Sequence, residues 1–437
     1  LSAGEWIILI LSVSNFIFMV NRLISWAIHH RFMVVVVTLV FTGFGLYQLT
    51  RTPVDAIPDL SDVQVIVFTE WPGRGPQVIE DQVTFPLVSS LQGIPRVKDI
   101  RGTSMFGMSF VYVVFEDGTD LYWARSRVLE RLNYAQKQLP PDVVPTLGPD
   151  ATGVGQVFWY TLEGKGYDLG TLRTIQDWYV RFALQDVPDV SEVASFGGFQ
   201  PQYQVRINPQ KLTYYHISLE DVLNAIRNNN RDVGGSVMDF NGANYVVRGL
   251  GYLKGIHDLE RIPVSTEGST PVLLKDVADV QMGGDHRLGI FDENGEGERV
   301  GGVVVMRYGA NADAVIRAVK EKMKSVQAGL PPGIHFHVVY DRSKLIEAAI
   351  HSVEHTLIEE LILVSVVIIV FLFHVRSALV AILTIPSAIV ISFIFIHWMG
   401  FNSNIMSLSG IAIAIGVIAD NAIVMIENAH RHLTENG

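Results

Sequence analysis

The chain has 437 residues, of which 49% are hydrophobic and only 18% are charged, and its formal net charge is −11. Soluble proteins carry about 25% charged residues, so this deficit indicates segments that cross a membrane. The acidic balance argues against a nucleic-acid-binding protein, which relies on basic surfaces, and the absence of cysteine excludes disulfides and thiolate metal sites.

The first 31 residues are expected to form an N-terminal segment on the cytoplasmic side. Residues 1–18 are apolar with Glu5 as their one charge, and they could form an additional span with the N-terminus outside. We prefer the alternative that Met19 is the natural start and that residues 1–18 are translated upstream sequence.

Four apolar stretches approach the roughly 20 residues that a membrane-spanning helix requires. They are residues 32–50, 357–373, 378–399 and 405–428. Basic residues flank the ends that would face the cytoplasm, whereas the turn 400–404 carries no charge. The sequence therefore predicts four spans, with residues 51–356 on the outer side of the membrane.

The outer region combines strand and helix patterns, which predicts an α+β fold. Residues 91–100 and 184–193 resemble each other, and each segment follows an amphipathic helical stretch and leads into a strand. We expect ferredoxin-like βαβ repeats, then a periplasmic linker helix over residues 341–356. The predicted fold class is an α-helical transmembrane bundle with a large inserted α+β region.

Asp420 lies well inside the fourth predicted span. A carboxylate near the middle of a bilayer costs about 2.5–3.5 kcal/mol on insertion scales, and such residues usually serve ion or proton movement. Glu427 follows at i+7, which places both carboxylates on one helix face, roughly 10.5 Å apart. Asp420, Glu427 and the neighbouring Asn421 are therefore candidates for a proton relay. The alternatives are a neutral Asp420 that donates an interhelical hydrogen bond, Glu427 at the cytoplasmic interface, and Asn421 as a packing residue.

Six motifs are distributed over the chain from about residue 19 onward. They are TPVDAIPDLSDVQV at 52–65, FEDGTD at 115–120, GPDATGVG at 148–155, HVRSALVA at 374–381, NIMSLSGIAIA at 404–414 and IVMIENAH at 423–430. Together they resemble the heavy-metal efflux branch of the resistance-nodulation-division (RND) superfamily, and within it the copper- and silver-exporting inner-membrane pumps. The resemblance implies that Asp420 is the proton-relay aspartate. It also implies that Met406 and Met425 belong to a thioether pathway for Cu(I) or Ag(I), without any cofactor besides the transported ion; sulfur donors suit such soft ions.

The resemblance further implies a division of the outer region. Residues 51–145 resemble a first porter subdomain, and residues 146–202 together with 283–340 resemble a second. Residues 203–282 resemble a docking insert that joins protomers in a homotrimer. The implied function is cation/proton antiport, without enzymatic chemistry. The implied location is the bacterial inner membrane, which the protein crosses several times and whose lipids it contacts. The implied partners are a periplasmic adaptor (membrane fusion) protein and an outer-membrane channel.

A complete pump of this kind continues for several hundred residues, so the chain is expected to be its N-terminal part. None of the four predicted spans contains an internal Lys or Arg, and the resemblance places the cationic partners of the relay, with the principal metal-binding methionines, in the second half. Ala414 stands where divalent-metal exporters carry an additional aspartate, which favours monovalent ions. Asn421 stands where drug exporters carry a second aspartate, and Ile418 interrupts the thioether pathway.

Other interpretations remain open from the sequence. They include an RND exporter of divalent metals or organic compounds, and a membrane-anchored periplasmic binding or sensor protein. His351, Glu354 and His355 fit the H-x-x-E-H pattern of some zinc proteases, although we prefer an ordinary polar turn. Met105 and Met108 are interpreted as packing residues, with a thioether metal site as the alternative.

Overall fold

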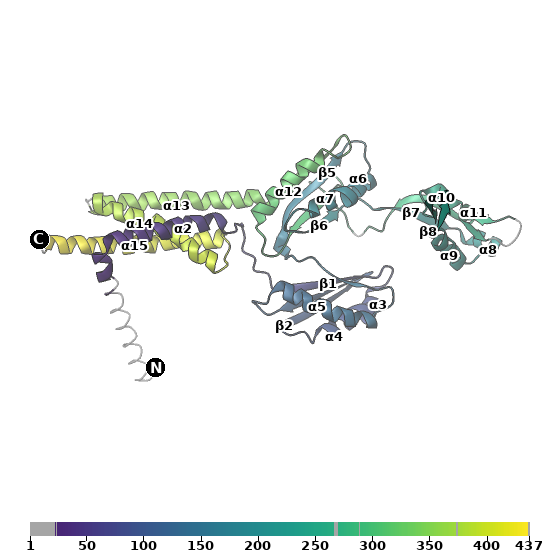
Figure 1. Ribbon diagram of the computed structural model, residues 1–437, viewed down its shortest axis with the longest axis horizontal. Coiled ribbons are helices and arrows are strands. Elements are labelled where there is room, and N and C mark those ends of the chain that lie inside the picture. The colour runs from purple at the N-terminus through teal and green to yellow at the C-terminus, as the bar shows by residue number, and fades with distance from the viewer. Residues whose placement is uncertain (1–21, 23, 266–269, 288, 373–374, 436–437) are drawn as a thin grey trace.

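The computed structural model describes residues 22, 24–265, 270–287, 289–372 and 375–435. The two interpretations of residues 1–18 concern a part of the chain outside these ranges. Figure 1 shows a group of long helices at one end, two α+β units in the middle and a smaller unit that projects from the other end.

Four long helices lie side by side in the first of these parts (Figure 1). They are α2 (Arg31–Arg51), α13 (Arg342–Leu372), α14 (Val375–Trp398) and α15 (Ile405–Glu435). Among the described residues, helix α2 and the stretch Ile405–Met425 of α15 are long and apolar enough to cross a membrane, and Ile382–Trp398 of α14 is a shorter apolar helix. The remaining two spans, and the four-span bundle as a whole, stay predictions.

Helix α13 is continuous from Arg342 to Leu372. The predicted linker helix 341–356 and the predicted second span therefore form one helix over their described residues. No Gly or Pro interrupts this stretch of sequence, so nothing in it ends the hydrogen-bonding pattern. The predicted second span is thus joined to the outer region without a break in the helix.

The first α+β unit is built on a four-stranded antiparallel sheet with the order β2-β3-β1-β4. Its strands are β1 (Gln64–Glu70), β2 (Val97–Met105), β3 (Met108–Phe115) and β4 (Pro145–Leu147). The helical segments are α3 (Pro76–Ile79), the π-turn η1 (Glu80–Thr84), α4 (Phe85–Leu91), α5 (Leu121–Ala135) and η2 (Gln136–Gln138). Alternate strand residues such as Val67 and Val111 form one core with Leu87 and Val128 of the helices. Strand β4 straddles the predicted boundary at residue 145.

The second unit repeats this arrangement. Its sheet has the order β14-β5-β13-β6, which places the four strands, counted along the chain, in the same positions as in the first sheet. The strands are β5 (Gln156–Gly164), β6 (Val190–Phe196), β13 (Val300–Met306) and β14 (Ile334–Asp341). The helical segments are η3 (Gly153–Gly155), α6 (Leu169–Ile175), the π-turn η4 (Gln176–Val180), α7 (Arg181–Gln185) and α12 (Ala312–Gln327). Both units have the split βαβ order of ferredoxin-like folds, and the predicted mixed α+β character is confirmed.

The two units also share a buried polar contact between the π-turn and the sheet. In the first unit, Thr84 Oγ1 lies 2.8 Å from the hydroxyl oxygens of both Ser104 and Ser109. In the second, the Gln176 amide accepts from the Tyr160 hydroxyl at 3.1 Å and donates to Ser195 at 3.3 Å. In both units a polar side chain of the π-turn thus binds two strands of the sheet, although the turn position and the strands differ.

The projecting unit is inserted between β6 and β13 of the second sheet. It is joined by a ribbon of two antiparallel strands, β7 (Pro201–Ile207) and β12 (Ala278–Gly284). Its other elements are α8 (Pro209–Tyr215), α9 (Leu219–Asn229), β8 (Val233–Phe240), β9 (Ala243–Gly249), α10 (Ile256–Glu260), β10 (Pro263–Ser265), β11 (Val272–Leu273) and α11 (Leu274–Val277). Val222, Leu259 and Leu274 belong to a separate core. Every residue of the β8–β9 strands is exposed.

Candidate transport site

Helix α15 carries all five residues predicted from the sequence for proton or metal transport. Its first turn is fixed by Asn404, whose Oδ1 accepts hydrogen bonds from the backbone N–H groups of Met406 and Ser407, both at 3.0 Å. Such a side chain satisfies donors that a helix leaves unpaired at its start. The cap places Met406 at the outer end of α15 and Asp420 within its apolar stretch.

One face of α15 is packed and the other is open. Ile415 and Ala419 are buried against Ile385 of α14. Asp420 and Glu427 are exposed, and at 100° per residue they lie about 20° from each other and roughly 80–140° from Ile415 and Ala419. The helix therefore presents both carboxylates away from α13 and α14.

Asn421 does not join this pair in the described structure. Its Nδ2 donates to the carbonyl of Val417 on the same helix at 2.9 Å. Over the described parts of the chain, the Asp420 carboxylate has no hydrogen bond or ion pair. A relay built on Asp420 thus takes its partner from outside these residues.

Met406 and Met425 are each 64% exposed and are not brought together. Nineteen residues of α15 separate them, which corresponds to about 28 Å along the axis and a difference of roughly 100° in direction. They cannot bind the same ion. Each thioether requires further donors of its own if it binds a metal.

A second group of residues, which the sequence analysis did not identify, lies where the long helices meet the outer region. We call it the junction, and it consists of residues 53–56, Val154, Arg342 and residues 403–405. Arg342 is 3% exposed, its guanidinium lies 2.9 Å from Asp55 Oδ1, and its Nη1 donates to the carbonyl of Val154. Its Nε and Nη2 have no aligned acceptor among the described atoms.

Backbone hydrogen bonds complete the junction. Asp55 N–H donates to Ser403 at 3.0 Å, and Ser403 N–H donates to Pro53 at 2.8 Å. The chain that leaves α2 is therefore paired with the turn that begins α15. Burial raises the pKa of Asp55 above its ordinary value, although the charge of Arg342 opposes this effect. The one feature of the sequence that pointed to this group was that Asp55 belongs to the motif at residues 52–65.

Asp150 connects the two α+β units. Its carboxylate accepts hydrogen bonds from Tyr122 of α5 at 2.9 Å and from Ser191 of β6, and it lies 3.2 Å from Arg307. Burial alone would raise the pKa of Asp150, but the Ser191 and Tyr122 hydroxyls and the Arg307 charge lower it below its ordinary value. The anion is thus the stable form of this link.

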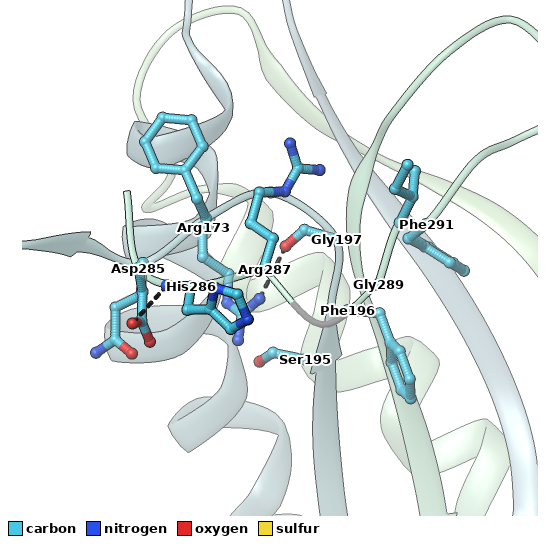
Figure 2. A pocket seen from close by; sticks show the side chains of 13 residues that line it. Arg173, Ser195, Phe196, Gly197, Asp285, His286, Arg287, Gly289 and Phe291 are labelled. Atoms are coloured by element: carbon cyan, nitrogen blue, oxygen red, sulfur yellow. Dashed lines mark hydrogen bonds between the residues drawn. The ribbon is translucent and has the colours of Figure 1, made fainter. Parts of the chain in front are cut away.

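A cavity of about 550 Å³ lies where the ribbon of the projecting unit leaves the second sheet (Figure 2). Its polar groups are largely engaged within the protein. Arg173 donates to the carbonyl of Gly197 at 2.8 Å and pairs with Asp177 at 2.7 Å, and Arg287 pairs with Glu298. These contacts stabilise the place where the projecting unit joins the second sheet, and among the described residues they leave the cavity without the set of free donors that a metal site requires.

Histidines of α13 and β14 lie beside carboxylates of the same chain. His355 lies 3.5 Å from Glu359, one turn along the same helix. His335 and His337 of β14 pair with Glu163 and Glu293, each at 3.1 Å. Within the described residues, no three His, Asp or Glu side chains converge on a position that could hold a metal ion. The structure gives no support to the zinc-protease interpretation.

Two ferredoxin-like units follow a membrane-length helix, and a carboxylate lies inside a later apolar helix. This combination is the one expected from the sequence for a membrane protein with a large outer porter region. Residues 23–437 match the AcrB/AcrD/AcrF family, and the chain belongs to this family. The predicted relationship to the RND superfamily and its heavy-metal branch is confirmed.

Individual relatives agree with this assignment. The chain is 50% identical over 420 residues to the "Putative cation efflux system protein SilA" of Salmonella typhimurium and to the "Cation efflux system protein CusA" of Escherichia coli (strain K12). Each alignment covers 95% of this chain and 40% of the relative. A crystal structure described as a heavy metal efflux pump matches with a TM-score of 0.85 at 33% identity, covering 94% of this chain and 41% of that one. The chain thus spans about 40% of the length of the relatives it matches.

Proposed function

We propose that the protein containing this chain is a proton-driven exporter of soft monovalent metal ions, Cu(I) or Ag(I). The observation that carries the proposal is Asp420, a carboxylate that has no partner among the described residues and lies inside an apolar, membrane-length helix of a chain related to cation efflux proteins. Loss and gain of a proton at Asp420 would change the charge of the open face of α15. Such a change favours different helix packings in the two states.

The junction supplies a route from α15 to the porter region. The turn before α15 is hydrogen-bonded to residues 53–56, and Asp55 of this segment faces the buried Arg342 at the start of α13. Arg342 in turn holds the carbonyl of Val154, in the connection between the two α+β units. A shift of α15 would therefore move both units, as alternating access requires.

The choice of a monovalent ion rests on donor chemistry. Met406 and Met425 offer thioether sulfur, which prefers Cu(I) and Ag(I) to harder divalent ions. Ala414 of the same helix stands at the position where divalent-metal exporters carry an additional aspartate, so the carboxylate that would favour a divalent ion is missing there. Because the two methionines lie far apart, we assign them to successive positions of a pathway rather than to one binding site.

The proposal also includes the assembly of the protein with further copies of itself and with partner proteins. The protein would form a homotrimer in the bacterial inner membrane, contact a periplasmic adaptor protein and deliver ions to an outer-membrane channel. The projecting unit supports this arrangement, because Val237, Phe240 and Val246 of its β8–β9 hairpin are each more than half exposed. Exposed apolar side chains on a projecting hairpin suit contact with a neighbouring copy.

The test is silver and copper tolerance of an efflux-deficient bacterium that expresses the complete gene encoding this chain. Wild type should raise tolerance, and Asp420→Asn should abolish the gain because Asn cannot carry the proton. Asp117→Asn makes the same chemical change on an exposed turn and should have no effect. In vesicles with an imposed pH gradient, only the wild type and Asp117→Asn should transport Ag(I). Tolerance that survives Asp420→Asn would contradict the relay, and tolerance to divalent metals alone would contradict the ion assignment.

A further inference from the structure

The hairpin between β2 and β3 places three potential metal ligands in one row. Met105 of β2 is directly opposite Met108 of β3, and Met108 is directly opposite Glu70 of β1. Directly opposite residues of antiparallel strands have Cβ atoms about 4.5–5.5 Å apart and project from the same face. The two thioethers and the carboxylate are therefore neighbours, although Glu70 lies far from the methionines in sequence.

The row lies on the face of the sheet that the helices do not cover. Ser104 and Ser109, the next pair along the hairpin, contact Thr84 of the π-turn and so face the helices. Side chains alternate along a strand, so Met105 and Met108 point to the opposite face. Met108 accordingly lines a cavity of about 650 Å³ between the two α+β units, beside Phe68 and Phe110.

The hairpin turn is held in place by the chain next to it. Trp71 N–H donates to the carbonyl of Gly107 at 2.8 Å, and Gly107 N–H donates to the carbonyl of Arg74 at 2.9 Å. Gly107 adopts a φ of 72°, which glycine tolerates without strain. The two methionines are thus presented by a fixed turn, while their own flexible side chains can adjust around an ion.

The row is accessible, and its carboxylate is free. Met105 is 47% exposed. Glu70 is exposed, and in the part of the chain that the structure describes its carboxylate forms no ion pair or hydrogen bond. The nearby Arg74 guanidinium lies over the Trp71 ring, 4.8 Å from its centroid, rather than on Glu70. A cation bound by the sulfurs would therefore find an uncompensated negative charge beside it.

We propose that Met105, Met108 and Glu70 form a binding site for a soft monovalent cation, Cu(I) or Ag(I), on the porter region. Two thioethers select soft ions, and one carboxylate balances a single positive charge. Through Met108 the site borders the cavity between the α+β units, where it can receive ions without passage through the membrane helices. This inference rests on the proposed function for the identity of the ion, and it revises the packing role assigned to the two methionines from sequence.

The experiment measures protection of methionine from oxidation in the complete, detergent-solubilised protein. Hydrogen peroxide is applied at increasing Ag(I), silver is then removed, and tryptic peptides are analysed by mass spectrometry. The peptide of residues 102–125 contains Met105 and Met108 and no other methionine. Only the unbound fraction reacts, so silver at ten times its dissociation constant should slow sulfoxide formation in this peptide about tenfold.

Met282 provides a matched internal control. It is 49% exposed, it pairs across its ribbon with Tyr203 rather than with another methionine, and it lies alone in the peptide of residues 276–287. Its oxidation rate should not change with silver. Met108→Leu, which nearly conserves volume and apolar character, should remove the protection of Met105, and Glu70→Gln should raise the silver concentration required. Thermal unfolding of each variant shows that the fold is retained.

Equal oxidation of residues 102–125 with and without silver would overturn the site, as would protection of Met105 that persists in Met108→Leu. The outcome is independent of the efflux test. Protection without silver tolerance would contradict the proposed export but leave the site intact. Tolerance without protection would contradict the site alone.

Discussion

The carboxylate of Asp150 joins two folded units through hydroxyl and guanidinium partners that come from both of them. Asp150→Asn keeps the shape but removes the charge that Arg307 faces. Hydrogen bonds to charged groups contribute about 1.5–3 kcal/mol, so we expect the free energy of unfolding to fall by roughly 1–3 kcal/mol. The measurement is thermal unfolding of the purified protein in detergent.

The pH dependence of this change follows from the lowered pKa of Asp150. A carboxyl whose pKa is lower in the folded state stabilises the fold above its unfolded pKa of about 3.9, and this stability is lost as pH falls through the folded value. The difference between wild type and Asp150→Asn should therefore stay constant from about pH 8 to pH 5. Asp142→Asn, at an exposed position nearby, should leave stability unchanged. A difference that vanishes already near neutral pH would contradict the assignment.

Residues differ in how far sequence alone reveals their roles. Asp420 was identifiable because a charge inside an apolar run is a local property of the sequence. Glu70 was not, because only the register of three strands brings it beside Met105 and Met108. The sequence also gave no reason to expect that Asp420 and Met406 lie on an open helix face, since that depends on which side of α15 meets α13 and α14.

The packing of α2 against α14 depends on a single glycine. A Cβ atom at Gly45 would lie 2.3 Å from the carbonyl oxygen of Val390, which no packed structure tolerates. Gly45→Ala should therefore force the helices apart and lower stability by about 1–3 kcal/mol. Thermal unfolding in detergent would show this as a lower midpoint.

Gly43 offers a control on the same helix. Apart from its chain neighbours and the backbone of its own helix, no atom of the described residues lies within 4 Å of the position that its Cβ would take. Gly43→Ala should be neutral or slightly stabilising, because Ala favours a helix more than Gly does. Equal effects of the two substitutions would show that helix propensity, and not the contact with α14, sets the stability.

Most elements of the outer region follow from sequence periodicity. The alternation in β1 and β3 and the amphipathic pattern of α12 each mark one buried face, which local sequence is sufficient to show. The π-turns η1 and η4 were not predicted, because a helix that widens by one residue keeps nearly the same apolar pattern. The union of the linker helix with the second span was likewise missed, since a change from polar to apolar residues does not end a helix.

At the scale of the whole molecule, the Asp55–Arg342 pair connects elements that are distant in the chain. Arg342→Gln leaves Asp55 without its countercharge, and Asp55→Asn leaves a buried guanidinium without an anion. Breaking one side of a buried ion pair costs about 3–5 kcal/mol. Each single variant should lower stability and silver tolerance, and the double variant should cost less than the sum of the two. Unfolding midpoints and silver tolerance of all four proteins provide the measurement.

The pair Asp313–Arg317 on α12 is the matched control. It joins the exposed Arg317 to the half-buried Asp313 one helical turn away, at 2.7 Å. Arg317→Gln should change stability by less than about 0.5 kcal/mol, because solvent screens such pairs. Strict additivity in the Asp55–Arg342 cycle would contradict the junction as a coupled unit.

The general architecture was predictable, and the contacts that unite it were not. A repeat, a topology of apolar stretches and a set of motifs indicated the α+β units and the family. Asp55 and Arg342 are 287 positions apart in a chain of 437 residues, and nothing in either local sequence reveals that they meet. Long-range pairing of single residues requires the folded coordinates.

The place at which the projecting unit enters the second sheet has an evolutionary consequence. Strands β6 and β13 are neighbours, with Phe196 opposite Gly301, so the chain leaves the sheet and returns to it at almost the same point. A tight turn in place of everything between these strands would still leave them side by side. One recombination event can therefore exchange the whole projecting module while the sheet keeps its hydrogen bonds. Lineages can diversify that module without rebuilding the unit that carries it.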